Sequence, residues 1–317
     1  MAVFLSEADV EKLVDIRIAL DAVESAHIAQ GEGTAIDVPR QRTRLPSSTM
    51  HILQGALPSE GVLGYKVYTS SREGNRFQVH LYDEKNGRPL AIIEANLLGM
   101  LRTGAMGGLS IKWLAREDAR VLGVFGSGWQ ARSQIEAACV VRPISEVKVY
   151  SRDRSKLEHF CDRMSLKVEC PVRPAQNPEE VVRGSDVIVT ITTATAPLFA
   201  ADWVEAGTHI VAAGSNSLIR REIDEATIRR ASAVVVDSRA TALREAGDLL
   251  PALEKGRLRE GQLIEIGEII AGCRAGRQKS SDITLFESQG MAIQDIALGR
   301  RVLQYARERG LGIDLPF

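Results

Sequence analysis

Hydrophobic positions change their spacing along the chain, and each change predicts a different kind of element. In "DIRIALDAVESAHIAQGEG", residues 15–33, apolar side chains recur at helical spacing and glycine follows, which predicts an amphipathic helix. From residue 62 the spacing shortens to alternate positions in "VLGYKVYTS", "RFQVHLYD" and "LAIIEA", which predicts strands. The Asn86-Gly87 pair between the last two is a turn signal, so we expect an antiparallel meander.

After residue 118, short β-branched runs alternate with helical or loop segments. The runs are "RVLGVFG", "EVKVYS", "DVIVTIT", "HIVAAG" and "AVVVD", and they predict an α/β fold with a doubly wound parallel sheet. A helix rich in small residues, "NLLGMLRTGAMGGLSIKWLAR", precedes them, and its small side chains suit close packing or the wall of a ligand cleft.

The chain ends in an amphipathic helix, "SQGMAIQDIALGRRVLQYARERG", placed after a loop in which we find no further strand signal. This helix can return to the first part of the chain. We therefore expect two domains: an inserted dinucleotide-binding domain, residues 118–290, and an α+β domain formed from residues 1–117 and 291–317.

A glycine-punctuated turn joins the first β-branched run to the helical segment after it. In "GVFGSGWQA" the pattern G-x-G-x-x-A falls on Gly126, Gly128 and Ala131. The first glycine permits the tight turn, the second lets backbone N–H groups reach a pyrophosphate, and the alanine allows close helix–sheet packing. The strand–turn–helix context favours a dinucleotide site over a plain tight turn.

The choice between NAD and NADP depends on the residues about 20 positions beyond this turn, where an acidic side chain often holds the adenosine ribose. Here the chain reads "VYSRDR". Ser151 does not repel a 2′-phosphate and Arg152 can pair with it, so the cofactor is NAD(P), with NADP favoured. Two alternatives stay open: Asp153 binds a ribose, or Arg152 only covers the adenine.

Composition narrows the partners to small molecules. The 40 basic and 41 acidic residues are interspersed and give a formal charge of −1, which argues against nucleic acid and anionic membranes as partners. No apolar run approaches the ~20 residues that span a bilayer, and the start lacks a signal-peptide pattern, so we expect a cytoplasmic protein. Four cysteines without a C-x-x-C pair and five scattered histidines predict no metal site.

Three separated motifs, "RTGAMGGLSIKWLA", "GSGWQA" and "ITLFESQGMAIQDIA", together resemble the ornithine cyclodeaminase and mu-crystallin family, in the same order over nearly the whole chain. The resemblance implies a Rossmann-type domain that holds NAD(P), inserted into a split domain that binds substrate and builds a homodimer. The first 120 residues are then the substrate half.

The resemblance also implies three cations for the substrate carboxylate, Arg42, Lys66 and Arg102, with Lys66 counted among the catalytic groups as well. Forked guanidinium donors and an ammonium group suit the permanent carboxylate of a small amino or imino acid. From the residues alone, each cation is equally well an exposed side chain. Arg44 is close enough to Arg42 to replace it in the alignment.

The family's catalytic carboxylate corresponds to Asp248 in "REAGDLLPAL". An aspartate there is equally explained as the N-cap of a helix that begins at Leu249. The remaining cofactor positions that the resemblance implies are Gln130, Thr192, Asn216, Ser288 and Gly290.

The resulting prediction is an NAD(P)-dependent oxidoreductase that transfers a hydride to the imino carbon of a small 2-imino or cyclic imino acid, or runs the reverse amino-acid dehydrogenation. One alternative is ornithine cyclodeaminase, which converts ornithine to proline and ammonia; another is a non-catalytic protein that binds NADP and a small ligand. The chain lacks the Met-Pro pair of many relatives, reading "MHILQGALP", and has Gly104 where alanine is common. The pocket segments offer no obvious acidic partner for the amine tail of ornithine.

Overall fold

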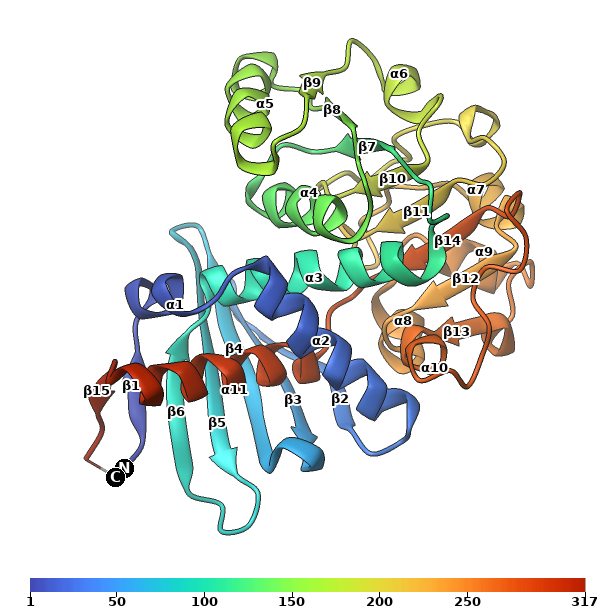
Figure 1. Ribbon diagram of the computed structural model, residues 1–317. Coiled ribbons are helices and arrows are strands. Elements are labelled where there is room, and N and C mark those ends of the chain that lie inside the picture. Colours follow the sequence, from blue (N-terminus) through green and yellow to red (C-terminus); the bar gives the residue numbers. More distant parts are fainter. Residues whose placement is uncertain (317) are drawn as a thin grey trace. The chain divides into compact units, whose positions relative to one another are not determined.

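The computed structural model describes residues 1–316 and divides into two compact units (Figure 1). Unit 1 comprises residues 1–102 and the chain from Met291 onward, and unit 2 comprises Thr103–Gly290. The first change of unit lies within helix α3 (Asn96–Leu114), whereas the sequence-based boundary was 117/118; the second follows Gly290. A continuous helix gives no composition break at which such a boundary could be seen.

Unit 1 is built on a seven-stranded sheet in the order β15-β1-β6-β5-β4-β3-β2. Strands β2 to β6 pair antiparallel with their sequence neighbours, and β1 adds parallel to β6. The predicted meander, β4 to β6, is confirmed, and β2 and β3 extend it. The strands are β1 (Val3–Leu5), β2 (Ile36–Arg44), β3 (Ser48–Leu57), β4 (Val62–Ser71), β5 (Gly74–Asp83), β6 (Pro89–Glu94) and β15 (Ile313–Asp314).

One face of this sheet is covered by helices. Figure 1 shows α2 (Ile16–Gly31) beside α11 (Ala292–Arg309), which contacts β3, β4 and β5. A Cβ at Gly299 in α11 would lie 3.3 Å from Val79, so glycine allows the helix to approach the sheet closely. Unit 1 also contains α1 (Glu7–Leu13) and a short 3-10 helix, η1 (Pro58–Glu60).

Unit 2 contains an eight-stranded sheet in the order β13-β12-β14-β11-β10-β7-β8-β9, parallel throughout. The predicted doubly wound sheet is confirmed. Its strands are β7 (Val121–Phe125), β8 (Glu146–Tyr150), β9 (Val172–Pro174), β10 (Val187–Thr190), β11 (His209–Ala212), β12 (Ala233–Val236), β13 (Leu263–Glu265) and β14 (Thr284–Glu287). The strand order reverses between β7 and β10, and ligands of such sheets bind beyond the carboxyl ends of the strands at this point.

The loop expected before the last helix contains a strand after all. β14 lies between β11 and β12 and is buried at every position. The expectation was wrong because a strand buried on both faces of a parallel sheet shows no alternation. The helices of unit 2 besides α3 are α4 (Trp129–Val141), α5 (Arg154–Val168), α6 (Pro178–Val182), α7 (Glu225–Arg230), α8 (Arg239–Glu245), α9 (Leu250–Glu254), α10 (Ile266–Ile270), η2 (Ala201–Trp203) and η3 (Glu260–Gln262).

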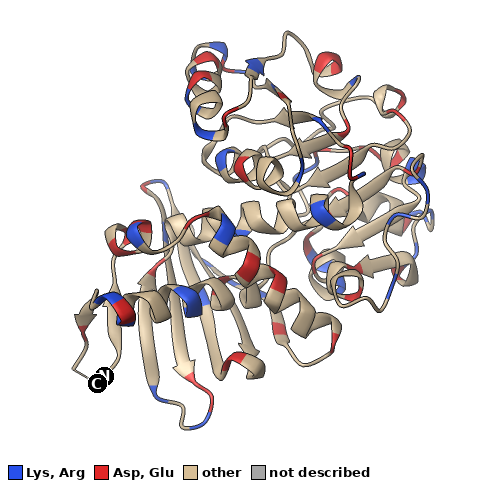
Figure 2. Cartoon of the chain, in the orientation of Figure 1, with Lys and Arg blue, Asp and Glu red and all other residues tan. Residues whose placement is uncertain are grey.

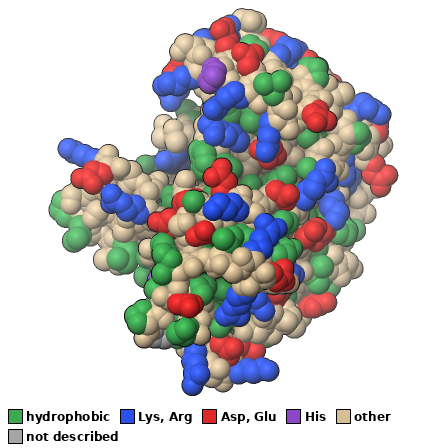
Figure 3. All heavy atoms as spheres, turned by 60° about the vertical axis from the view of Figure 1, so that its left-hand side comes forward, with side chains coloured by type: hydrophobic (Ala, Val, Ile, Leu, Met, Phe, Trp, Pro, Cys, Tyr) green, Lys and Arg blue, Asp and Glu red, His purple; other side chains and the backbone are tan. Residues whose placement is uncertain are grey.

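Charged side chains of both signs are distributed over both units. Figure 2 shows basic and acidic residues scattered over the elements of both units, and on the face seen in Figure 3 the two signs are mixed with apolar side chains. Of the helices within residues 1–316, none combines the length and the apolar character that crossing a bilayer requires.

Candidate functional site

The turn between β7 and α4 leaves open space where a dinucleotide would lie. Gly126 has a φ of +113°, and a Cβ there would lie 2.6 Å from the carbonyl oxygen of Ile191, so only glycine fits. Gly128 is the N-cap of α4, no side chain caps this end, and no atom lies within 4 Å of its Cβ position. The first N–H groups of α4 are therefore available to a pyrophosphate, and the residues present fit a bound dinucleotide.

Helix α4 also explains the glycines of α3. A Cβ at Gly104 would lie 2.4 Å from the Cβ of Ser133, and one at Gly107 would lie 1.9 Å from Oε1 of Gln134. Gln134 donates to the carbonyl of Thr103 at 3.1 Å. Of the two sequence-based interpretations, close packing therefore accounts for Gly104 and Gly107. Gln130 and Ala131 lie in the first turn of α4, half-buried and buried respectively.

Of the residues that follow β8, one is exposed and another caps the next helix. Ser151 is half-buried and Arg152 is exposed. Asp153 is the N-cap of α5, where it accepts hydrogen bonds from the backbone N–H of Lys156 at 3.3 Å and the hydroxyl of Ser155 at 3.0 Å. Hydrogen bonds from Lys156 and Ser155 hold the pKa of Asp153 below its usual range. The Asp153 carboxylate thus already accepts hydrogen bonds from the first turn of α5.

Asp237, directly after β12, fixes the loop that follows β14. Its Oδ2 accepts hydrogen bonds from the Ser288 hydroxyl at 3.1 Å and from the backbone N–H groups of Gln289 and Gly290 at 2.8 and 2.6 Å. Its Oδ1 accepts from the N–H of Ser238. The sequence-predicted pair Ser288 and Gly290 is therefore held by a residue that sequence reasoning missed. The only sequence signal for Asp237 was its position directly after the β-branched run "AVVV".

Asp248 is 1% exposed and does not cap a helix. Helix α9 begins at Leu250, and Leu249 is its N-cap without a side-chain hydrogen bond. Oδ1 of Asp248 instead accepts from the backbone N–H groups of Glu222 and Ile223 at 2.6 and 2.9 Å. The N-cap alternative is thus wrong, because the carboxylate is turned toward a distant loop.

Glu222 accepts hydrogen bonds from one predicted cofactor residue, Thr192, and from the loop that carries another, Asn216. It accepts from the N–H and hydroxyl of Thr192 at 2.6 and 2.7 Å, from the hydroxyl of Thr190, and from the N–H of Gly214. Gly214 begins the loop that carries Asn216, which is exposed. Burial raises the pKa of Glu222 to about 7 against these hydrogen bonds. Sequence reasoning missed this residue because its partners lie in other loops.

In unit 1, Lys66 and Arg102 converge on Asp295 of α11. The Lys66 ammonium lies 2.9 Å from Oδ1 of Asp295, and Nε of Arg102 lies 3.1 Å from the same oxygen. Arg102 also donates to Oε1 of Gln294 at 3.0 Å. Two cations and one carboxylate leave a net positive charge that a substrate carboxylate can balance. Asp295, which is 0% exposed, was missed because its partners are far away in sequence.

Burial dominates the titration of Lys66. The side chain is 3% exposed, and desolvation lowers its pKa to about 8, although Asp295 acts in the opposite direction. A Cβ at Gly99 would lie 3.0 Å from the Lys66 nitrogen, so glycine at that position leaves room for the ammonium. The alternative of an outward-facing strand lysine is wrong for Lys66.

Arg42 lies on the same sheet face as Lys66. Arg42 is opposite His51 and Lys66 is opposite Leu53, and positions 51 and 53 of one strand point to the same side. Burial and the positive charge of Arg42 lower the pKa of His51 to about 4. Arg44 is exposed at the end of β2. Arg40, which sequence reasoning missed, is buried and near enough to lower the pKa of Lys66.

Asp295 thus brings Lys66 and Arg102 together in unit 1. In unit 2, Thr192 is held by Glu222, and Ser288 and Gly290 are held by Asp237. The sequence model of the "Ornithine cyclodeaminase/mu-crystallin family" matches residues 1–310. The chain is 38% identical over 240 residues to a Delta(1)-pyrroline-2-carboxylate reductase of Bacillus cereus, a match that covers 75% of this chain and 74% of the relative.

Solved structures of relatives are similar to this chain over nearly its full length. Delta(1)-pyrroline-2-carboxylate reductase of Thermococcus litoralis, in complex with NADH and L-proline, superposes with a TM-score of 0.94 at 32% identity, covering 99% of this chain and 100% of that one. An archaeal alanine dehydrogenase dimer with bound NAD gives a TM-score of 0.94 at 32% identity, covering 100% and 99%. The resemblance inferred from the motifs is confirmed: this chain belongs to the ornithine cyclodeaminase/mu-crystallin family.

Proposed function

We propose that this chain is an NAD(P)-dependent oxidoreductase that transfers a hydride to the imino carbon of a small 2-imino or cyclic imino acid, and that it also runs the reverse dehydrogenation. The observation that carries the proposal is the buried cluster of Lys66, Arg102 and Asp295, whose net positive charge suits one carboxylate. The open turn at Gly128 suits the dinucleotide. Relatives named for pyrroline-2-carboxylate reduction and alanine dehydrogenation support the same chemistry.

The cations of unit 1 bind and orient the substrate. Lys66 and Arg102 hold the substrate carboxylate, and Arg42 approaches from the same sheet face. Fixing the carboxylate limits the orientations of the α-carbon, which is the atom that changes oxidation state. Asp295 keeps the two cations together before substrate binds. Lys66, with its lowered pKa, is also a candidate for proton transfer.

In unit 2, the cofactor residues bind and orient the nicotinamide cofactor, which supplies or accepts the hydride when bound. We assign the dinucleotide to the turn at Gly126 and Gly128 and to the first residues of α4, Gln130 and Ala131. Further positions assigned to it are Thr192, Asn216, Ser288 and Gly290.

Asp248 is the carboxylate that we assign to the substrate nitrogen. An imine must be protonated, or held as an iminium ion, while the hydride arrives at carbon. A carboxylate therefore serves as acid and base or as counter-ion. Burial raises the pKa of Asp248 against hydrogen bonds from two backbone N–H groups.

NADP is the cofactor form we favour. Ser151 carries no charge that would repel a 2′-phosphate, and the exposed guanidinium of Arg152 can pair with it. The capping role of Asp153 supports this choice, since its carboxylate already accepts hydrogen bonds from α5.

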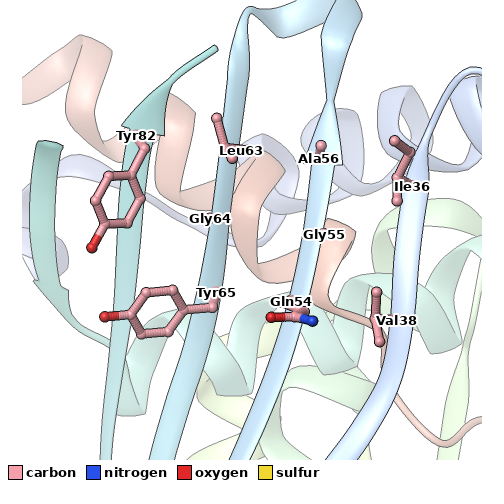
Figure 4. A pocket seen from close by; sticks show the side chains of 9 residues that line it. All are labelled: Ile36, Val38, Gln54, Gly55, Ala56, Leu63, Gly64, Tyr65 and Tyr82. Atoms are coloured by element: carbon pink, nitrogen blue, oxygen red, sulfur yellow. The ribbon is translucent and has the colours of Figure 1, made fainter. Parts of the chain in front are cut away.

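We also propose a homodimer built through the sheet face of unit 1 that lies opposite α11. Strands β2 to β5 form a shallow cavity of about 510 Å³ on this face, lined by Ile36, Val38, Gln54, Gly55, Ala56, Leu63, Gly64, Tyr65 and Tyr82 (Figure 4). Ile36 is 58% exposed and Leu63 38%, and a contiguous apolar patch that includes such exposed side chains is typical of an association surface. An archaeal alanine dehydrogenase is described as a dimer. Unit 1 would then bind substrate and dimerise, and unit 2 would bind the dinucleotide.

The four free cysteines support a cytoplasmic location, because reduced thiols are typical of reducing compartments. The interspersed charges of Figure 2 favour small-molecule substrates over nucleic acid.

Isotope transfer tests the reaction class. Purified protein is incubated with pyrroline-2-carboxylate, piperideine-2-carboxylate or iminosuccinate, or with pyruvate and an amine, together with NAD(P)H deuterated at C4. We expect deuterium at the α-carbon of the amino-acid product. A parallel incubation with ornithine and catalytic NAD⁺ should give little proline. Rapid formation of proline and ammonia without net cofactor consumption would contradict the proposal.

A further inference from the structure

Four carboxyl groups are buried together beyond the carboxyl ends of the central strands of unit 2. Glu287 is the last residue of β14 and Asp237 follows β12, while Glu222 and Asp248 come from loops. Each is at most 1% exposed. The charges of Asp248, Glu222 and Asp237 all act on Glu287. Four ionised carboxylates at such short range would repel one another strongly, so the distribution of hydrogen-bond donors decides which of them keep a charge.

Two of the four are well supplied with hydrogen-bond donors. Asp237 accepts four hydrogen bonds, from three backbone N–H groups and the hydroxyl of Ser288. Glu222 also accepts four, from Thr190, Thr192 and Gly214. Several donors directed at one carboxylate replace the water that burial removes.

Asp248 and Glu287 are less well supplied. Oδ1 of Asp248 accepts two backbone N–H groups, whereas Glu287 accepts at Oε1 from the amide of Gln289 at 3.0 Å. Apart from these two carboxyl groups, no group among the described residues is hydrogen-bonded to Oδ2 of Asp248 or Oε2 of Glu287, although both atoms are buried. The two carboxyl groups are near enough that each shifts the pKa of the other. A hydrogen bond between two carboxyl groups requires that one of them carries a proton.

We infer that Glu287 is a carboxylic acid that donates its proton to a hydrogen bond with Asp248, so that the two residues form a pair with one proton and one negative charge. Glu287 takes the proton because it has the fewest donors to stabilise a charge. This inference rests on the proposed role of Asp248 and makes Glu287 a positioning residue for it. The pKa shifts agree: burial and the charge of the neighbouring Asp248 raise the pKa of Glu287 well above its ordinary value, while burial raises the pKa of Asp248 and the hydrogen bond from Glu287 opposes that rise.

The pair specifies the form of the substrate. With the proton on Glu287, the negative charge lies on Asp248, which suits a protonated iminium group better than a neutral imine. The charged groups that bear on the pair are Glu222, Asp237 and, on the positive side, Arg221, whose charge lowers the pKa of Asp248. The substrate therefore takes up its nitrogen-bound proton before hydride transfer, and no proton need leave the pair in that step.

Carboxyl-carbon NMR of the full chain tests the protonation state directly, with or without bound cofactor. Protein labelled with ¹³C at the glutamate side-chain carboxyl is titrated, and the Glu287 signal is assigned by its loss in Glu287→Gln. We expect this signal at the position of a carboxylic acid at pH 7, while the exposed glutamates of the same sample are ionised and serve as internal reference. A Glu287 signal at the carboxylate position at pH 7 would overturn the inference.

Two variants of similar size test the positioning role. Glu287→Gln keeps a donor for Asp248 and an acceptor for Gln289, so kcat/KM for imine reduction should stay within about tenfold of the wild type. Glu287→Leu leaves Oδ2 of Asp248 without a donor, so kcat/KM should fall about 10²-fold and the acid limb of its pH profile should move to higher pH. Equal damage by both variants, with an unmoved acid limb, contradicts the positioning role.

Asp248→Asn separates the inference from the proposed function. If Asp248 is catalytic, activity falls about 10²–10⁴-fold while the protein remains folded. Full activity in this variant, together with a protonated Glu287, would leave the pair established and overturn the catalytic role of Asp248. The NMR result does not depend on any substrate.

Discussion

At the scale of single residues, Asp295 determines how unit 1 holds the buried Lys66 and the partly buried Arg102. It lies within 2.9 Å of Lys66 and 3.1 Å of Arg102, and is 0% exposed. Asp295→Asn would leave both cations without a counter-charge and further lower the pKa of Lys66, since Asp295 raises it. We expect the free energy of unfolding in urea to fall by about 3–5 kcal/mol.

The ion pair between Glu60 and Arg301 provides the control, because it lies nearer the surface with a distance of 3.2 Å. Glu60→Gln should lower the free energy of unfolding by less than about 1 kcal/mol. An equal loss in both variants would show that Asp295 has no special role in neutralising the cluster.

Lys66 makes substrate binding depend on pH. Its pKa of about 8 lies below the ordinary lysine value, so the side chain is charged below pH 8 and becomes neutral as the pH rises through it. The carboxylate loses one cation in that range, and kcat/KM, which reports the free enzyme, should fall above about pH 8. Lys66→Arg stays charged and should move this fall to higher pH. An alkaline limb at the same pH in the arginine variant would assign it to another group.

Ser151 tests the cofactor preference. Isothermal titration should show that NADPH binds at least as tightly as NADH. Ser151→Asp should shift the preference toward NADH by repelling the 2′-phosphate. Asp153→Asn serves as control: it removes charge from the N-cap of α5, and its main effect should be on stability. A strong preference of the wild type for NADH would contradict the NADP proposal.

At the scale of elements, the turn from β7 to α4 separates a folding requirement from a binding requirement. In Gly126→Ala the added methyl group would clash with the carbonyl oxygen of Ile191, and alanine would have to adopt a positive φ. The free energy of unfolding should therefore fall by about 1–3 kcal/mol. In Gly128→Ala the added methyl group has no atom within 4 Å, so the free energy of unfolding should change by less than about 0.5 kcal/mol.

The same two glycines differ in what they do to binding. The added methyl at Gly128 would occupy the space assigned to the pyrophosphate, and NAD(P)H affinity, measured by fluorescence titration, should fall at least about tenfold. Unchanged affinity in Gly128→Ala would place the dinucleotide elsewhere.

The sequence revealed those elements whose pattern is local. The β-branched runs and the alternating strands predicted β7, β8, β10, β11 and β12 and the meander from β4 to β6. β2 was not predicted, since "IDVPRQRTR" is mostly polar, and β14 showed no alternation because it is buried throughout. The fold class therefore followed from the sequence, although several strands did not.

The candidate site was predictable only in part, for a related reason. The glycine turn has a local signature, whereas Asp295 with Lys66, Asp237 with Gly290, and Glu287 with Asp248 are partners across long stretches of sequence. Residue spacing along the chain does not predict pairs that are so far apart in sequence. The roles of Arg42, Lys66, Arg102 and Asp248 came from the family resemblance and stay predictions.

At the scale of the whole molecule, the exposed face of the unit 1 sheet predicts association. The wild type should sediment as a dimer, and Leu63→Arg, in the lining of the apolar cavity on that face, should shift it to monomer. Leu166→Arg is the matched control, because Leu166 is 85% exposed on α5 of unit 2. A monomeric wild type, or equal dissociation by both variants, would contradict the proposed interface.

The way unit 2 is inserted has a consequence for protein engineering. The chain leaves unit 1 at Arg102 and re-enters it at Met291, and the Arg102 side chain bonds to Gln294 and Asp295, so exit and re-entry are close together. Joining them demands little loop-closure entropy. A short glycine–serine bridge in place of residues 103–290 should therefore give a free-standing module that retains the carboxylate-binding cations, and a different nucleotide-binding unit could be grafted at the same two positions.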